Sequence, residues 1–141
     1  MKRMQKVTRI VGLCLVATIG LTGCAAQDGP PITEVKSAAA LQEQMAAGVM
    51  VIHALDAEHY AKGHVPGAIN IDYEKMTPEM LPAEKNKPMV FYCAGGMCPV
   101  GRMAANKARS WGYTNVSVYE GGIKDWRAAG MNVEYGSEPR P

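Results

Sequence analysis

Four short apolar segments, separated by segments with helical spacing, limit this chain to one broad class of fold. The apolar segments lie at residues 49–55, 68–71, 89–92 and 115–119, and their length suits buried strands. Helical patterns occupy residues 38–47, 100–111 and 123–129, each followed by a glycine that can end a helix. Strands that alternate with helices predict an α/β fold, with a central, mainly parallel sheet flanked by helices.

The first residues of the chain have the pattern of an export signal. Four basic residues within positions 2–9 precede an uncharged apolar run at 10–21, which is too short to span a membrane. The run ends in Leu-Thr-Gly-Cys at 21–24, which resembles the bacterial lipobox. We therefore expect a lipoprotein signal peptide at 1–23, lipidation of Cys24, a tether at 24–33 and one domain at 34–141. An ordinary signal peptide cut nearby is the alternative.

The expected processing defines where the protein acts. Several acyl chains on Cys24 would anchor it stably to a lipid bilayer. Ala25 stands where the inner-membrane retention signal has Asp, which favours an outer-membrane lipoprotein that faces the periplasm. Cys14 would leave with the signal and Cys24 would be lipidated, so Cys93 and Cys98 would be the remaining thiols in an oxidising compartment.

Processing also reverses the sign of the net charge. The chain of 141 residues has 15 Lys and Arg against 13 Asp and Glu, a net charge of +2. Removing residues 1–23 takes away four basic residues and no acid, which leaves 11 against 13 and a net charge of −2. A slightly acidic domain predicts no nucleic-acid partner. The composition also excludes collagen, a disulfide-dense mini-protein and a disordered chain.

Cys93 is the candidate for chemistry. It directly follows the apolar segment 89–92, and parallel α/β sheets bind ligands at the carboxyl ends of their strands. Ala94, Gly95 and Gly96 allow the backbone to curl, and the helix expected at 100 would direct its positive end to the same place. This setting predicts a lowered pKa and a nucleophilic thiolate, which would accept an anionic substrate. The alternative is an inert, buried cysteine.

Several motifs in this region, taken in order, resemble the rhodanese (sulfurtransferase) family. They are Gly-His-Val-Pro-Gly-Ala-Ile-Asn at 63–70, Val-Phe-Tyr-Cys at 90–93, Gly-Tyr-x-Asn-Val at 112–116 and Glu-Gly-Gly-Ile-x-x-Trp at 120–126. The resemblance covers residues 49–133 and implies a single-domain, three-layer rhodanese-like fold. In the turn at 63–70, His64 is expected to be structural. The glycines at 121 and 122 are expected to let a second loop approach the site.

The family resemblance also implies a reaction. Cys93 would take the sulfane sulfur of thiosulfate or polysulfide as a persulfide and pass it to a thiol, a protein acceptor or cyanide. The reaction requires no metal or organic cofactor. Substrate-binding roles are implied for the loop at 94–98 and for one cation on the helix that follows it, that is for Ala94, Gly95, Gly96, Met97, Cys98 and Arg102.

Two departures from the common rhodanese pattern leave alternatives open. His53 and Leu55 stand where many members have Asp-x-Arg, with His53 expected as a hydrogen-bonded histidine near the sheet. The usual Cys-x4-Arg loop is here Cys-x4-Cys, as in a secreted subgroup, so Cys98 could be a resolving thiol, a second sulfur acceptor or an inert residue. The domain could accordingly be a non-catalytic sulfur carrier, or Cys93 and Cys98 could form a thiol–disulfide redox pair.

Overall fold

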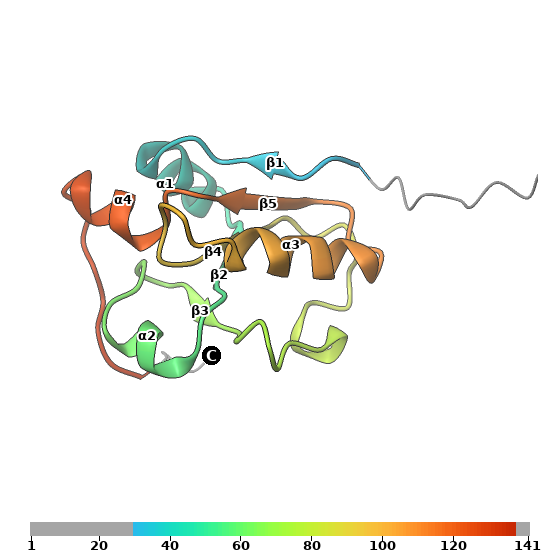
Figure 1. The fold of residues 1–141 in the computed structure, drawn as a ribbon. Coiled ribbons are helices and arrows are strands. Elements are labelled where there is room, and N and C mark those ends of the chain that lie inside the picture. The colour runs from blue at the N-terminus through green and yellow to red at the C-terminus, as the bar shows by residue number, and fades with distance from the viewer. Residues whose placement is uncertain (1–29, 138–141) are drawn as a thin grey trace, which may run out of the picture.

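A single parallel sheet forms the centre of the molecule (Figure 1). The computed structural model describes residues 30–137. Five strands pair in the order β1-β5-β4-β2-β3, and every pairing is parallel. Their bounds are β1 Thr33–Glu34, β2 Met50–His53, β3 Ile69–Asn70, β4 Met89–Tyr92 and β5 Val116–Tyr119. The predicted α/β class with a mainly parallel sheet is confirmed.

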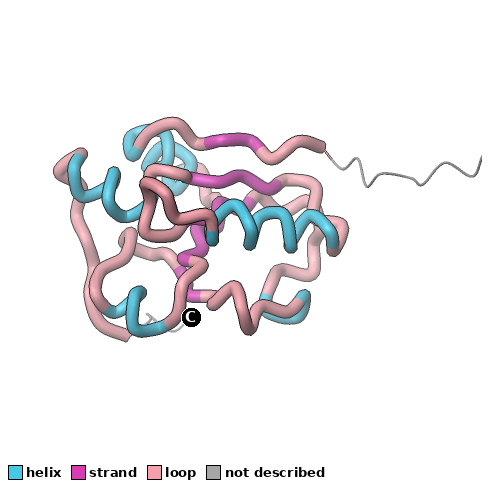
Figure 2. Tube along the Cα trace, viewed as in Figure 1, coloured by secondary structure: helices cyan, strands magenta, loops and turns pink. Residues whose placement is uncertain are grey.

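Three helices lie at the positions predicted from the sequence, and a further short helix lies between β2 and β3 (Figure 2). Ser37 and Asp56 cap the first two helices by accepting hydrogen bonds from backbone N–H groups. The bounds are α1 Ala38–Ala46, α2 Ala57–Ala61, α3 Val100–Ser110 and α4 Gly122–Ala128, with one 3₁₀ turn, η1, at Pro78–Met80.

The two faces of the sheet bury separate clusters of side chains. Ile52 and Phe91 are register partners on one face, where they pack with alanines of α3 such as Ala104. Val51 and Val90 are register partners on the other face, where α1 and α4 provide the cover. In Figure 1, α3 lies in front of the strands and α1 behind them. The strands are apolar throughout because both of their faces are buried, and the result is a three-layer fold.

Strand β1 was not predicted from the sequence. Thr33 and Glu34 pair with Ser117 and Val118 of β5, and the N–H of Val35 donates to the Val118 carbonyl at 2.8 Å. The pair is only two residues long, and it carries no apolar alternation. Thr33 and Glu34 form a strand because they pair with the edge of β5. Thr33, which was placed in the predicted tether, is therefore part of the sheet.

The predicted anchor lies outside the described residues. Residues 1–29, which include the predicted signal peptide and Cys24, are not among them. Within residues 30–137, no helix has both the length and the apolar character needed to cross a bilayer. The signal peptide and the lipidation therefore stay predictions.

The turn at 63–70 is held against the end of β4 by buried tyrosines. The N–H of Val65 donates to the Tyr92 hydroxyl at 3.0 Å, and the Tyr60 hydroxyl donates to the Ala68 carbonyl at 2.6 Å. His64 stacks on the Tyr60 ring, with 3.6 Å between centroids, and its Nδ1 lies 2.9 Å from the Tyr60 carbonyl. The structural role predicted for His64 is confirmed.

The bond from Val65 to Tyr92 generates a stability prediction. Tyr92→Phe removes the acceptor of a buried N–H, so we expect the free energy of unfolding to fall by about 1–3 kcal/mol. Urea denaturation followed by circular dichroism would measure the loss. Tyr135→Phe is the matched control because that side chain is 69% exposed, and its effect should stay within about 0.5 kcal/mol. Equal stability of the two variants would contradict the role of this hydrogen bond.

Candidate active site

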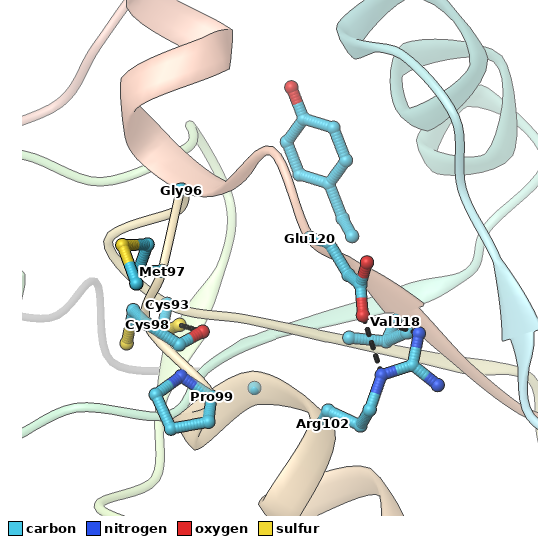
Figure 3. Close-up of a pocket in the computed structure, with 10 residues that line it drawn as sticks. Cys93, Gly96, Met97, Cys98, Pro99, Arg102, Val118 and Glu120 are labelled. Atoms are coloured by element: carbon cyan, nitrogen blue, oxygen red, sulfur yellow. Dashed lines mark hydrogen bonds and ion pairs between the residues drawn. The ribbon is translucent and has the colours of Figure 1, made fainter.

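Cys93 is the first residue after β4, at the carboxyl end of a central strand (Figure 3). Only 3% of its surface is exposed. The loop at 93–99 leads from it directly into α3. The Cys93 sulfur therefore lies at the carboxyl ends of the strands, where parallel folds bind their ligands.

The start of α4 holds the loop at 93–99 in place through backbone hydrogen bonds. The N–H of Ile123 donates to the Cys93 carbonyl and the N–H of Lys124 donates to the Ala94 carbonyl, both at 3.1 Å. A Cβ on Gly95 would lie 1.8 Å from the Gly121 carbonyl oxygen, and a Cβ on Gly122 would lie 2.4 Å from that of Cys93. Only residues without side chains allow this approach, so the role predicted for the pair at 121 and 122 is confirmed for Gly122, whereas a Cβ on Gly121 would meet the Asp125 side chain instead of the loop.

The pKa of Cys93 is opposite to the sequence prediction. Burial raises the pKa of the thiol above its usual value, and a hydrogen bond with the Cys98 side chain raises it further. The backbone N–H groups of Gly95 and Gly101 act in the other direction, because they hydrogen-bond the sulfur and favour its anion. The predicted donors are present, but desolvation outweighs them. The free protein therefore holds Cys93 as a thiol, which donates to the Cys98 carbonyl at 3.2 Å.

Gly101 is a site residue that was not predicted. It lies in the first turn of α3, where backbone N–H groups have no partner within the helix. A Cβ there would lie 3.1 Å from the Tyr92 Cα, so the absence of a side chain lets the helix approach β4 closely. The signal in the sequence was a glycine inside a helical pattern, which often has a packing or functional reason.

A pocket of about 200 Å³ opens beside the sulfur. Of the predicted substrate-binding residues, Gly96, Met97, Cys98 and Arg102 line it together with Cys93, whereas Ala94 and Gly95 do not. Met97 is fully exposed. The lining not predicted from the sequence comes from α3, from the residue before it and from the end of β5, namely Pro99, Gly101, Val118, Tyr119 and Glu120.

The charge at the rim of the pocket is partly cancelled. Arg102 forms an ion pair with Glu120, and both side chains are nearly half exposed (Figure 3). An incoming anion would have to compete with the Glu120 carboxylate for the guanidinium. The arrangement leaves the backbone N–H groups of Gly95 and Gly101 as the donors directed at the reacting sulfur itself.

His53 lies near the active loop, and one of its ring nitrogens lacks the hydrogen bond that was expected for this residue. Its side chain is 99% buried at the end of β2, and within the part of the chain that the structure describes its Nδ1 has no hydrogen-bond partner. Burial lowers its pKa to about 4, so the ring is neutral at physiological pH. It borders a second cavity, of about 220 Å³, that reaches Ala94 and Arg127. Cys93 is not part of that lining, so His53 faces the back of the loop.

The site has the components of a covalent thiol reaction. A buried thiol, two amide donors and a pocket meet at the carboxyl end of β4. Among residues 30–137, no three His, Cys, Asp or Glu side chains gather in a way that could hold a metal ion.

Comparison with known proteins identifies the family. The model of the "Rhodanese-like domain" matches residues 37–129. The chain is 30% identical over 109 residues to the HTH-type transcriptional regulator Rv0324 of Mycobacterium tuberculosis, a match that covers 77% of this chain and 48% of the regulator. It is 30% identical over 95 residues to the thiosulfate:glutathione sulfurtransferase of Saccharomyces cerevisiae, covering 58% of this chain and 67% of that enzyme.

Solved structures agree with the sequence relatives. The BH2092 protein from Bacillus halodurans superposes with a TM-score of 0.66 at 31% identity, covering 73% of this chain and 77% of that one. A thiosulfate sulfurtransferase from Pseudomonas aeruginosa shares the fold at 20% identity with a TM-score of 0.64, covering 77% of this chain and 21% of that one. The chain spans about half the length of the mycobacterial regulator. On the family match and the parallel fold, this chain belongs to the rhodanese-like domain family.

Proposed function

We propose that this protein is a sulfurtransferase that moves sulfane sulfur from thiosulfate or polysulfide to a thiol or cyanide acceptor through a Cys93 persulfide. The observation that carries the proposal is the position of the Cys93 sulfur. It borders the pocket and accepts hydrogen bonds from the N–H groups of Gly95 and Gly101. The names of two relatives, a thiosulfate:glutathione sulfurtransferase and a thiosulfate sulfurtransferase, support the same donor and a thiol acceptor.

The proposed reaction has two steps. The Cys93 thiolate attacks the outer sulfur of thiosulfate, a bond forms between the two sulfurs, and the old sulfur–sulfur bond breaks with its electron pair leaving on sulfite. The Gly95 and Gly101 N–H groups hydrogen-bond the Cys93 sulfur, so they would stabilise negative charge on the adjoining persulfide without rearrangement. An acceptor thiolate attacks the outer sulfur of the persulfide and regenerates the Cys93 thiolate.

The first test removes the nucleophile. Cys93→Ser should reduce sulfite release from thiosulfate, with cyanide as acceptor, to the rate without protein, because the covalent step is lost. The matched control is the double variant Cys93→Ser/Ser110→Cys, which restores the number of thiols at the exposed end of α3 and should stay inactive. Sulfite release by either variant at the wild-type rate would contradict the assignment. Uptake of one sulfur by the wild type without repeated turnover would indicate a sulfur carrier.

A second test uses the pKa of the nucleophile. Because burial raises the pKa of Cys93, the thiolate fraction grows with pH through and above the value of about 8.5 that is usual for a free thiol. The rate of Cys93 alkylation by iodoacetamide, measured in the Cys98→Ser background, should rise with pH along this curve. A rate that reaches its plateau below neutral pH would show that the amide donors outweigh burial.

We also propose that the sulfurtransferase works at the cell envelope, anchored through acylated Cys24 with its domain facing the periplasm. The support is the basic segment, the apolar run and the Leu-Thr-Gly-Cys box in residues 2–24. With Ala25 after the lipidated position, the outer membrane is the proposed destination.

Metabolic labelling tests the anchor. Growth of an expressing bacterium with radiolabelled palmitate should label the wild-type chain, because Cys24 becomes acylated, and Cys24→Ser should abolish the label. Cys14→Ser is the matched control: it replaces a cysteine ten residues earlier, within the apolar run, and should keep the label. Label that persists in Cys24→Ser would contradict the proposal, and density-gradient fractionation would report which membrane holds the wild type.

A further inference from the structure

Cys98 occupies a position next to the nucleophile that the proposed reaction does not use. The loop turns back on itself, with the Cys98 N–H donating to the Gly95 carbonyl at 3.4 Å. This turn brings the Cys98 carbonyl to 3.2 Å from the Cys93 sulfur. The Cys98 side chain also acts on the Cys93 thiol, whose pKa it raises. Both side chains border the same pocket, and Cys98 is the more exposed of the two (Figure 3).

The segment between the two cysteines can adjust its shape. Gly95 and Gly96 have φ values of +91° and +67°, in the left-handed region that glycine adopts without strain. A bond between the cysteines would close a small loop that contains both glycines and the fully exposed Met97. A Cβ on Gly96 would meet open space, and Met97 is fully exposed, so neither side of this segment packs against the core.

We propose that Cys98 is the first acceptor for the Cys93 persulfide, which it resolves by forming a Cys93–Cys98 disulfide and expelling hydrosulfide. This inference rests on the proposed function, because it requires the persulfide to form. It assigns Cys98 a catalytic role, and it assigns hydrosulfide as a product of the site.

The step balances in atoms and electrons. The Cys98 sulfur attacks the inner sulfur of the Cys93 persulfide, a bond forms between these two sulfurs, and the bond to the outer sulfur breaks. The outer sulfur leaves with the electron pair and takes up the proton of the Cys98 thiol, so it departs as hydrosulfide. It is thereby reduced by two electrons, and the two cysteine sulfurs are oxidised to a disulfide. An external thiol or dithiol then reduces the disulfide and returns both cysteines to the thiol form.

The chemistry of the leaving group favours attack on the inner sulfur. Attack on the outer sulfur, which is the route of the external acceptor, expels the Cys93 thiolate, whose pKa burial raises, and of two leaving groups the less basic one departs faster. Attack on the inner sulfur expels hydrosulfide, which is a weaker base than a buried alkyl thiolate. The inner sulfur is also the atom that the Cys98 carbonyl contacts in the free protein.

A single-turnover experiment tests the step. The full chain carries Cys14→Ser and Cys24→Ser in every variant, so that only Cys93 and Cys98 bear thiols. Each reduced protein receives one equivalent of thiosulfate without oxygen, and sulfite, hydrosulfide and intact mass are recorded. The parent should release one sulfite and one hydrosulfide per chain and lose the mass of two hydrogens. Cys98→Ser should release sulfite alone and gain the mass of one sulfur, and Cys93→Ser should release neither product.

The outcomes separate the two proposals. Sulfite from both the parent and Cys98→Ser, with the added sulfur retained in both, would overturn the role of Cys98 and leave the sulfurtransferase intact. Peptide mapping that finds the sulfur on Cys98 would overturn release as hydrosulfide. No sulfite from either protein would overturn both proposals. A parent kept without thiosulfate controls for oxidation and should keep its mass.

Discussion

The active site depends on two hydrogen bonds between loops. The N–H groups at the start of α4 hold the carbonyls of Cys93 and Ala94, and those carbonyls are thereby turned away from the sulfur. The chain then curls through Gly95, whose N–H reaches the sulfur from the inside of the loop. The contact requires glycine on both sides, because a side chain on either would collide with the opposite backbone. These two hydrogen bonds hold the loop in the conformation that surrounds the Cys93 sulfur.

The reactivity of Cys93 follows from two opposed effects in the same small space. Burial keeps the resting sulfur neutral, while the two amides favour an anion in its place. A persulfide would extend from Cys93 toward the pocket, so its outer sulfur would carry charge outside the buried position of the thiol. The site therefore suits the proposed sulfur transfer, and Cys98 lies beside the proposed intermediate.

Much of the fold followed from local patterns. The strand β4 is four apolar residues that lie where they were predicted, and α3 begins at Val100, the first residue predicted for that helix. The position of Cys93 at a strand end followed from the same reasoning. Three features could not be predicted because they depend on distant partners: the pairing of β1 with β5, the ion pair of Arg102 with Glu120, and the approach of Gly101 to Tyr92.

By itself, the sequence determined the alternation of strands and helices, the place of Cys93 at a strand end and the glycines around it, because periodicity and residue type act over a few neighbouring positions. Only the tertiary structure decided the ionisation state of Cys93. The pKa of Cys93 is a sum of burial by surrounding layers, a contact with Cys98 and donors from Gly95 and Gly101. These contributions come from residues that only the folded chain brings together. A local sequence pattern does not predict how deeply a side chain will be buried.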